Sequence, residues 1–186
     1  MVDLMAGHAN EALDARAGLV DRAGQGEGAA FASIVRLHDA DMTRVCFVIC
    51  GDLDLAEEAV AAAWPIAWKK LGSLRDPERL RPWLVSVAAN EARQLLRRQR
   101  RRSVVELSVA ARPDRSAPDS WGSVADLDLA NSLARLKPED RTLLALRYVA
   151  GFDSTELARA TGRSASGTRA RLARLLDRLR TELRDD

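Results

Sequence analysis

The chain has 186 residues, of which 47% are hydrophobic, 30% are charged and 4% are aromatic, and its formal net charge is +2. This length allows one domain or two small ones, and the abundance of aliphatic residues, alanine and arginine without strand-type alternation favours an all-α protein. No apolar run is long enough to span a bilayer and no signal peptide pattern is present, so we expect a cytoplasmic protein without membrane insertion.

The small net charge conceals a strong asymmetry along the chain. Residues 1–62 contain eleven acidic side chains and four arginines, a net charge of −7. By contrast, residues 93–102 hold six arginines and no acid, and residues 159–184 hold eight arginines against two acids, a net charge of +6. Two separate basic segments predict two separate contacts with a polyanion.

Helical spacing of apolar residues predicts four helices in the front part of the chain, over 10–23, 31–50, 55–68 and 82–102. Gly51 ends the second of these helices, and Asp52 or Asp54 can cap the third. Pro65 should kink that third helix because it removes an amide donor. Residues 69–81 are polar and contain Gly and Pro, which predicts a loop.

The helix over 82–102 has two different faces. Its packing face is expected to contain Leu84, Val87, Ala88, Glu91 and Leu95. Its opposite face repeats polar residues at helical spacing, namely Ser86, Asn90, Arg93 and Arg97. One side of this helix should therefore pack while the other offers hydrogen-bond donors.

Residues 103–123 contain Pro, Ser, Asp and Gly without a helical period, which is typical of a flexible linker. The sequence therefore predicts two small helical domains, over 1–102 and 124–186. In the second domain we expect four helices, at about 125–135, 138–150, 154–161 and 164–184.

The last two of these helices have the pattern of a helix-turn-helix. Asp153 and Glu156 form a capping box that opens the first, and Gly162 permits a tight turn before the second. Opposite the leucine stripe of the last helix lie small residues and arginines: Ser166, Gly167, Ala170, Arg171, Arg174 and Arg178. Such a surface suits a DNA major groove, and a solvated basic face is the alternative reading.

Catalytic and metal-binding motifs are hard to find. Cys46 and Cys50 are the only cysteines, and with His38 they would lack a fourth metal ligand, so buried reduced thiols are the better interpretation. The chain has no phosphate-binding glycine loop, zinc-protease motif or nucleophile elbow, and only two histidines. We therefore expect no cofactor, no metal and no enzymatic activity.

Two blocks carry a resemblance to a known family. The first runs from Asp52-Leu-Asp-Leu-Ala-Glu-Glu-Ala-Val through Trp64 and Trp68 to Trp83-Leu-Val-Ser-Val-Ala-Ala-Asn and Arg97-Arg98. The second runs from Leu136-Lys-Pro-Glu-Asp-Arg through Asp153-Ser-Thr-Glu-Leu-Ala to Gly162 and Arg171-Leu172. In this order they resemble regions 2 and 4 of the extracytoplasmic-function sigma factors of bacterial RNA polymerase.

This resemblance implies a non-enzymatic protein that directs polymerase to promoters. Its partners would be core RNA polymerase (beta-prime clamp and beta flap), promoter DNA and, as for many short sigma factors, an anti-sigma factor. The implied polymerase-binding residues are Asp54, Glu57 and Glu58. Those implied for the −10 element are Ser73, Arg75, Asn90, Arg93, Arg97 and Arg98. Those implied for the −35 element are Ser164, Ser166, Arg169, Arg171 and Arg174.

The second block departs from the family pattern at three positions. Thr161, Arg163 and Thr168 stand where the family usually has apolar residues. The packing of this domain should therefore be less apolar than usual. Three interpretations stay open: a divergent promoter preference, a less stable domain that needs its partner, or a sigma-like regulator that has lost −35 recognition.

Overall fold

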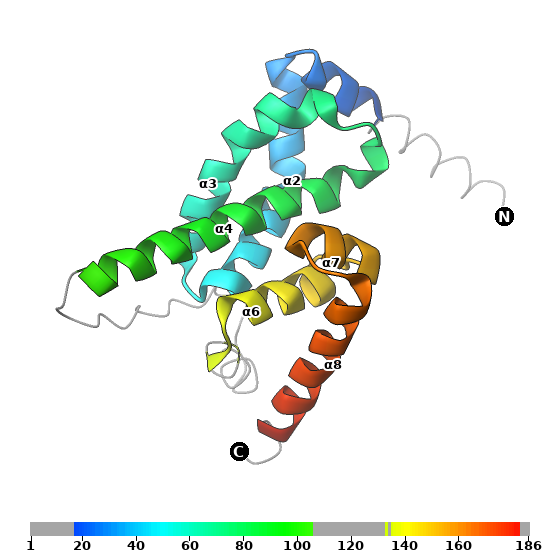
Figure 1. Ribbon diagram of the computed structural model, residues 1–186. Coiled ribbons are helices and arrows are strands. Elements are labelled where there is room, and N and C mark those ends of the chain that lie inside the picture. Colours follow the sequence, from blue (N-terminus) through cyan, green and yellow to red (C-terminus); the bar gives the residue numbers. More distant parts are fainter. Residues whose placement is uncertain (1–16, 106–132, 134, 183–186) are drawn as a thin grey trace, which may run out of the picture.

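The computed structural model describes residues 17–105, 133 and 135–182, and every regular element within these ranges is a helix (Figure 1). The predicted all-α class is thus confirmed. The expected linker over 103–123 lies almost entirely outside the described residues, as does the expected helix at 125–135. The expected first helix is described only from residue 17, where a helix runs to residue 24.

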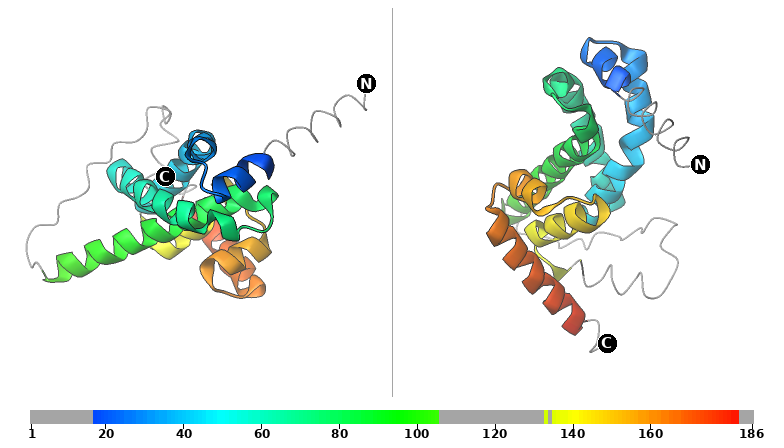
Figure 2. Two further views of the ribbon diagram at one scale, coloured as in Figure 1. Left: turned by 90° about the horizontal axis from the view of Figure 1, so that it is seen from above. Right: turned by 90° about the vertical axis from the view of Figure 1, so that its right-hand side faces the viewer.

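Three long helices build the front bundle: α2 (Gly28–Cys50), α3 (Leu53–Lys70) and α4 (Leu80–Val105). Each packs against the other two, and the helix at 17–24 covers one end of the group (Figure 2). Small alanines let the three helices approach closely, while a few large apolar side chains fill the centre. The largest fully buried side chains of this bundle are Ile34, Met42, Val45, Ile49, Leu71, Leu84 and Val85.

The junction between α2 and α3 follows from local chemistry. Gly51 adopts a left-handed conformation with φ 72°, and its amide donates to the carbonyl oxygen of Phe47, which ends α2. The Asp52 carboxylate then accepts the amide of Leu55 at 2.8 Å, so Asp52 rather than Asp54 caps α3. Pro65 lies inside α3, which continues to Lys70.

The segment predicted as a loop over 69–81 is shorter and more regular than expected. It contains two single turns of 3₁₀-helix, Leu71–Ser73 and Pro77–Arg79, and α4 begins directly after the second. Asp76 caps the second turn by accepting the amide of Glu78 at 3.1 Å. These short-range bonds were not visible as a helical period because each turn is only three residues long.

The packing face of α4 differs from the predicted one. Ala89, Ala92 and Leu96 are buried, whereas Glu91 and Leu95 are only half-buried. The small alanines carry little hydrophobic signal individually, which is why the pattern favoured the larger residues next to them.

The second bundle comprises α6 (Pro138–Leu144), a π-helical turn (Ala145–Val149), α7 (Ser154–Thr161) and α8 (Ala165–Glu182). The π-turn interrupts what the sequence predicts as one helix over 138–150. This bundle encloses a smaller apolar centre than the first. Its buried side chains include Leu143, Leu144, Leu146, Phe152, Leu157, Leu175 and Leu179.

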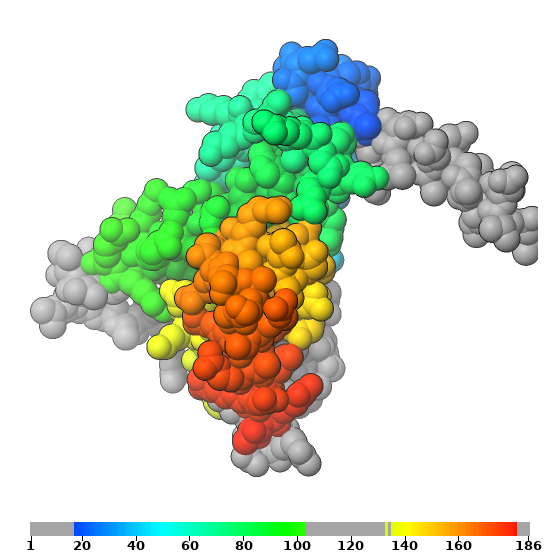
Figure 3. All heavy atoms as spheres, turned by 45° about the vertical axis from the view of Figure 1, so that its right-hand side comes forward, coloured from blue at the N-terminus to red at the C-terminus, as the bar shows by residue number. Residues whose placement is uncertain are grey.

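The two bundles touch one another. The end of α2 packs against α6 and the π-turn, and buried apolar side chains of both bundles form one continuous cluster. Arg141 of α6 is buried and lies close to Gly51, with its Nη1 3.2 Å from where a β-carbon on that glycine would be. The second bundle therefore covers part of the first (Figure 3).

Cys46 and Cys50 are buried free thiols, as predicted. Burial raises the pKa of both, that of Cys50 to about 12, because the thiolate loses its hydration. Among the described residues there is no cluster of metal-ligating side chains. Within those same ranges, no helix is long and apolar enough to cross a membrane.

Candidate nucleic-acid interface

The helix-turn-helix pattern is present as predicted. The Asp153 carboxylate accepts the amides of Thr155 and Glu156 at 2.7 and 2.8 Å, and the Glu156 carboxylate accepts the amide of Asp153 at 3.0 Å. Gly162 then ends α7 with φ 66°. The amide of Glu156 lowers the pKa of Asp153, so this box is intact above the ordinary pKa of an aspartate and weakens as the pH falls below it.

The beginning of α8 presents small polar side chains. Ser164 and Ser166 are exposed, and the Ser164 hydroxyl accepts the amide of Gly167 at 3.1 Å. This bond satisfies one of the amides that a helix start leaves without a partner. Because Gly167 carries no side chain, the backbone at this end of α8 can approach another molecule closely.

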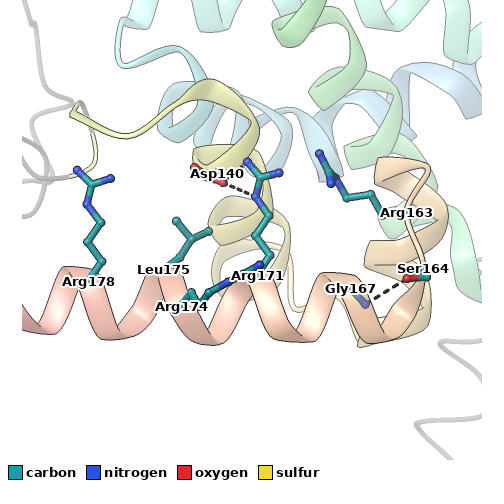
Figure 4. A pocket seen from close by; sticks show the side chains of 8 residues that line it. All are labelled: Asp140, Arg163, Ser164, Gly167, Arg171, Arg174, Leu175 and Arg178. Atoms are coloured by element: carbon teal, nitrogen blue, oxygen red, sulfur yellow. Dashed lines mark hydrogen bonds and ion pairs between the residues drawn. The ribbon is translucent and has the colours of Figure 1, made fainter.

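A basic groove of about 580 Å³ follows between α8 and α6. Figure 4 shows Arg163, Arg171 and Arg178 extending to the same side, where α6 carries Asp140. The Arg171 Nε donates to Asp140 Oδ1 at 2.6 Å, so this arginine is held in place and its charge is partly neutralised. The contact of Asp140 could not be predicted from the sequence, because its partner lies 31 residues further along the chain.

Two of the predicted arginines on α8 differ from Arg171 in their contacts, although Arg174 also lines this groove. Arg169 and Arg174 are exposed, and neither makes an ion pair within the part of the chain that the structure describes. They are thus better placed than Arg171 to bind phosphate or a base edge with their full charge.

The three unusual polar residues occupy three different environments. Arg163 is exposed and lines the basic groove. Thr161 is half-buried, and its hydroxyl donates to the Leu157 carbonyl oxygen at 2.7 Å. Thr168 is 0% exposed, and its hydroxyl has no hydrogen-bond partner among the described residues. Of these three polar residues, only Thr168 lies inside the packed interior, so the packing of the second bundle is less apolar than usual mainly at this position.

This buried hydroxyl leads to a stability prediction. Replacing Thr168 by Val should raise the free energy of unfolding by about 1 kcal/mol, because a methyl group replaces a polar group that loses its water on folding. Urea denaturation monitored by circular dichroism would measure the change. Thr168→Ser is the matched control, since it keeps the hydroxyl and loses a methyl; it should be less stable than the wild type. A T168V variant no more stable than the wild type would show that the hydroxyl is satisfied.

The second basic strip lies along α4 and the loop before it. Ser73 and Arg75 are exposed in that loop, and Arg97 and Arg98 are exposed near the other end of the helix. From Leu80 to Arg97 the helix rises by about 26 Å, so these residues form a long strip rather than a pocket.

The middle of the strip is partly covered. The Arg93 guanidinium donates to the side-chain oxygen of the exposed Asn90, and its Nη2 also donates to the Ala160 carbonyl oxygen at 3.3 Å. Burial lowers the pKa of Arg93, with a further contribution from the charge of Arg97. The polar face of α4 thus offers hydrogen-bond donors as predicted, but at Arg93 one of them is already used by the second bundle.

The tryptophans lie at the edge of the core rather than inside it. Trp64 is half-buried, packs edge-on against Phe31 with ring centroids 5.7 Å apart, and donates its Nε1 hydrogen to Asp39 at 2.8 Å. Trp68 is 37% exposed and also contacts Phe31. Trp83 is half-buried beside Asn90 in a groove between the bundles.

The acidic residues predicted to bind polymerase lie in the first two turns of α3. Asp54, Glu57 and Glu58 are all exposed. Glu57 also lines a groove of about 550 Å³ between α2 and α3, together with apolar and polar side chains of both helices: Asp39, Ala40, Thr43, Arg44, Phe47, Leu53, Val60, Ala61 and Trp64. This groove could not be predicted from the sequence, because it depends on how α2 and α3 lie relative to each other.

Two helical bundles with a helix-turn-helix, two basic strips and exposed acids on α3 define a class of helical nucleic-acid-binding proteins. Residues 34–102 match Sigma-70 region 2, and residues 126–179 match Sigma-70, region 4. The chain is 31% identical over 127 residues to the RNA polymerase sigma factor CarQ of Myxococcus xanthus, which covers 68% of this chain and 73% of CarQ. It is 29% identical over 167 residues to the ECF RNA polymerase sigma factor SigL of Mycobacterium tuberculosis, covering 86% and 94%.

The chain therefore belongs to the RNA polymerase sigma factors, within their ECF group, and the predicted resemblance is confirmed. It matches only 40% of the length of one longer relative, a probable RNA polymerase sigma factor from Xanthomonas campestris. The fold is also that of RpoE from Bartonella quintana, solved in complex with the anti-sigma factor NepR. The TM-score is 0.73 at 23% sequence identity, over 84% of this chain and 98% of RpoE.

Proposed function

We propose that this sigma factor brings core RNA polymerase to promoters by three contacts on three different surfaces. The acidic face of α3, with Asp54, Glu57 and Glu58, docks on the beta-prime clamp of the polymerase. The strip from the loop before α4 to Arg98 binds the −10 element, and the start of α8 binds the −35 element, while the helices before it meet the beta flap. No step of chemistry is assigned to the chain itself, and its place of action is the cytoplasm, where the polymerase works.

The observation that carries this proposal is the separation of two exposed basic strips on two bundles. Arg97 and Arg98 are exposed on α4, and Arg169 and Arg174 are exposed on α8. Each strip can neutralise phosphates of one duplex at a different position. A protein with a single DNA contact would need only one of them.

Within the −10 strip we propose different roles for its parts. Arg97 and Arg98 supply charge to the DNA backbone, since they are exposed at the far end of α4. Ser73 and Arg75, in the loop, and Asn90, in the middle of α4, would contact a base drawn out of the stack, beside the half-buried Trp83. Removing a base from the stack costs a few kcal/mol, so the pocket must return matched hydrogen bonds and stacking.

On α8 we propose that Arg169 and Arg174 make the principal −35 contacts together with Ser164 and Ser166. Arg171 is assigned a smaller, positional role, because Asp140 already holds its guanidinium. An anti-sigma factor is a further expected partner, in view of the complex in which the structurally similar RpoE was solved.

A sigma-like regulator without initiation activity is the alternative. It would keep the helix-turn-helix but has no need for both the acidic face of α3 and the basic strip of α4. The experiment is to purify the tagged chain with its bound partners and to sequence the associated DNA. We expect core polymerase subunits and DNA fragments that share a two-part motif; purification without polymerase would favour the alternative.

A further inference from the structure

The helix at 17–24 lies against the loop before α4, at one end of the front bundle (Figures 1 and 2). Its Val20 and Ala23 are buried, and both belong to the apolar cluster that also contains Leu71, the first residue of that loop. This helix precedes the part of the chain that matches Sigma-70 region 2, which begins at residue 34. The match therefore assigns the helix no role.

The backbones of the helix and the loop meet at two glycines. A β-carbon on Gly24 would lie 3.4 Å from Gly72 Cα and 3.7 Å from the Gly72 nitrogen. A β-carbon on Gly72 would lie 3.4 Å from the Gly24 carbonyl oxygen. So close an approach of two backbones is possible because neither residue carries a side chain. The end of the helix thus supports the loop directly at Gly72.

The helix end is itself a well-defined turn. Gly26 has φ 95°, and its amide donates to the Ala23 carbonyl oxygen at 3.0 Å. The Glu27 amide donates to the Arg22 carbonyl oxygen at 3.0 Å, and α2 begins at the next residue. Together these two bonds close the end of the helix in the manner of a Schellman motif. Gly24 is therefore held in a fixed position relative to α2.

The hydrogen bonds of the loop are local. The Ser73 hydroxyl donates to the Lys70 carbonyl oxygen at 2.6 Å, and the Leu74 amide donates to the Leu71 carbonyl oxygen at 2.9 Å. Bonds of this kind fix the shape of the loop but not its place on the bundle. That place depends on the packing of the buried Leu71 and on the contact at Gly72.

The place of the loop matters for the base contacts proposed for Ser73 and Arg75. Both side chains are exposed, and Ser73 follows Gly72 directly. A shift of Gly72 is passed on to Ser73 because the peptide unit between them is rigid. Contacts that select one base need to be held within about 0.5 Å of their best geometry, since hydrogen bonds weaken steeply when they are misaligned.

We propose that the helix at 17–24 sets the position of the loop before α4, with Gly24 and Gly72 as positioning residues for the selection of a −10 base. This inference rests on the proposed role of Ser73 and Arg75 at the −10 element. The helix acts through the loop and contacts no DNA itself. Disturbing it should therefore reduce the discrimination between bases, while Arg97 and Arg98 still bind the DNA backbone.

Three variants test this role. Gly24→Val adds bulk at the contact, and valine is stiff in a helix, so the loop has to move aside. Val20→Ala loosens the buried side of the helix without adding bulk. Gly18→Val is the matched control, because it makes the first change in the same helix where a β-carbon has no neighbour within 4 Å. Circular dichroism checks that each variant is folded.

The measurement uses each variant assembled with core polymerase. The probes are fluorescent single-stranded oligonucleotides that carry the −10 part of the motif recovered with the wild-type chain, either unaltered or with one base replaced. The ratio of the two affinities gives the discrimination at each position. Binding of the unaltered probe at several salt concentrations gives the contribution of backbone contacts.

Gly24→Val should lower the discrimination at one position about tenfold and Val20→Ala about threefold, within the range that a base contact contributes, with the salt dependence of the wild type. Gly18→Val should discriminate like the wild type. If Gly24→Val does not fold, Val20→Ala decides alone. Full discrimination in every folded variant of Gly24 and Val20 overturns the proposal, and so does an equal loss in Gly18→Val.

A further double variant separates this inference from the proposed function. Ser73→Ala with Arg75→Ala removes the proposed base contacts themselves. If it leaves the discrimination unchanged, the proposed role of the loop is wrong and the inference fails with it. If it abolishes the discrimination while the variants of Gly24 and Val20 keep it, the loop reads the base and only the positioning role of the helix is wrong.

Discussion

Reversing the charges of Glu57 and Glu58 to Lys should weaken the binding of core polymerase at least about a hundredfold. Both carboxylates are exposed on α3, so the substitutions leave the apolar core intact. Facing a basic partner, the new lysines replace two attractions by two repulsions, and like charges across an interface cost several kcal/mol. Fluorescence anisotropy of the labelled chain titrated with core polymerase would measure the loss.

The matched control reverses two exposed acids elsewhere. Asp21→Lys with Asp177→Lys makes the same change in net charge but lies outside α3. It should bind core polymerase like the wild type. Equal weakening by both double variants would mean that net charge, not the face of α3, governs docking.

Replacing Arg169 and Arg174 by Ala should lower the affinity for promoter duplex by roughly a hundredfold. Each bidentate arginine contact to a base edge contributes about 1–3 kcal/mol, and each phosphate contact adds about one unit to the salt dependence. We therefore also expect a visibly smaller slope of affinity against salt concentration. The measurement is duplex binding at several salt concentrations, on DNA recovered with the wild-type chain.

A double variant with the same loss of charge provides the comparison. Arg22 and Arg36 are exposed in the first bundle, away from α8. Their replacement by Ala should leave duplex binding nearly unchanged. If Arg171→Ala alone weakens binding more than the Arg169 and Arg174 pair, then Asp140 holds a contact residue and the roles proposed on α8 must be exchanged.

The local features of the fold were predictable from the sequence. The end of α2 at Gly51, the cap at Asp52 and the capping box of α7 depend on residues within a few positions of one another. Such short-range chemistry can be identified in one sequence. The spacing of residues on α8 likewise predicted most of its exposed face, on which Arg174 and Arg178 are exposed and Arg171 is half-buried.

Contacts between distant residues could not be predicted. Arg81 and Ala150 are 69 positions apart, and Arg93 and Ala160 are 67 positions apart. Helical periodicity states which residues share a face but not what that face meets. For the same reason the pattern placed Arg93 on the polar face of α4 but could not show that its guanidinium donates to α7. The π-turn over 145–149 was also missed, because its residues continue the helical pattern of α6.

Run-off transcription with purified core polymerase is the most direct test of the account. The templates are the genomic fragments recovered with the chain. We expect discrete transcripts only when the chain is added, and their loss in both the α3 and the α8 double variants. Transcription that is unchanged by adding the chain, or that survives both double variants, would contradict the claim that its two basic strips and its acidic face act together on one promoter.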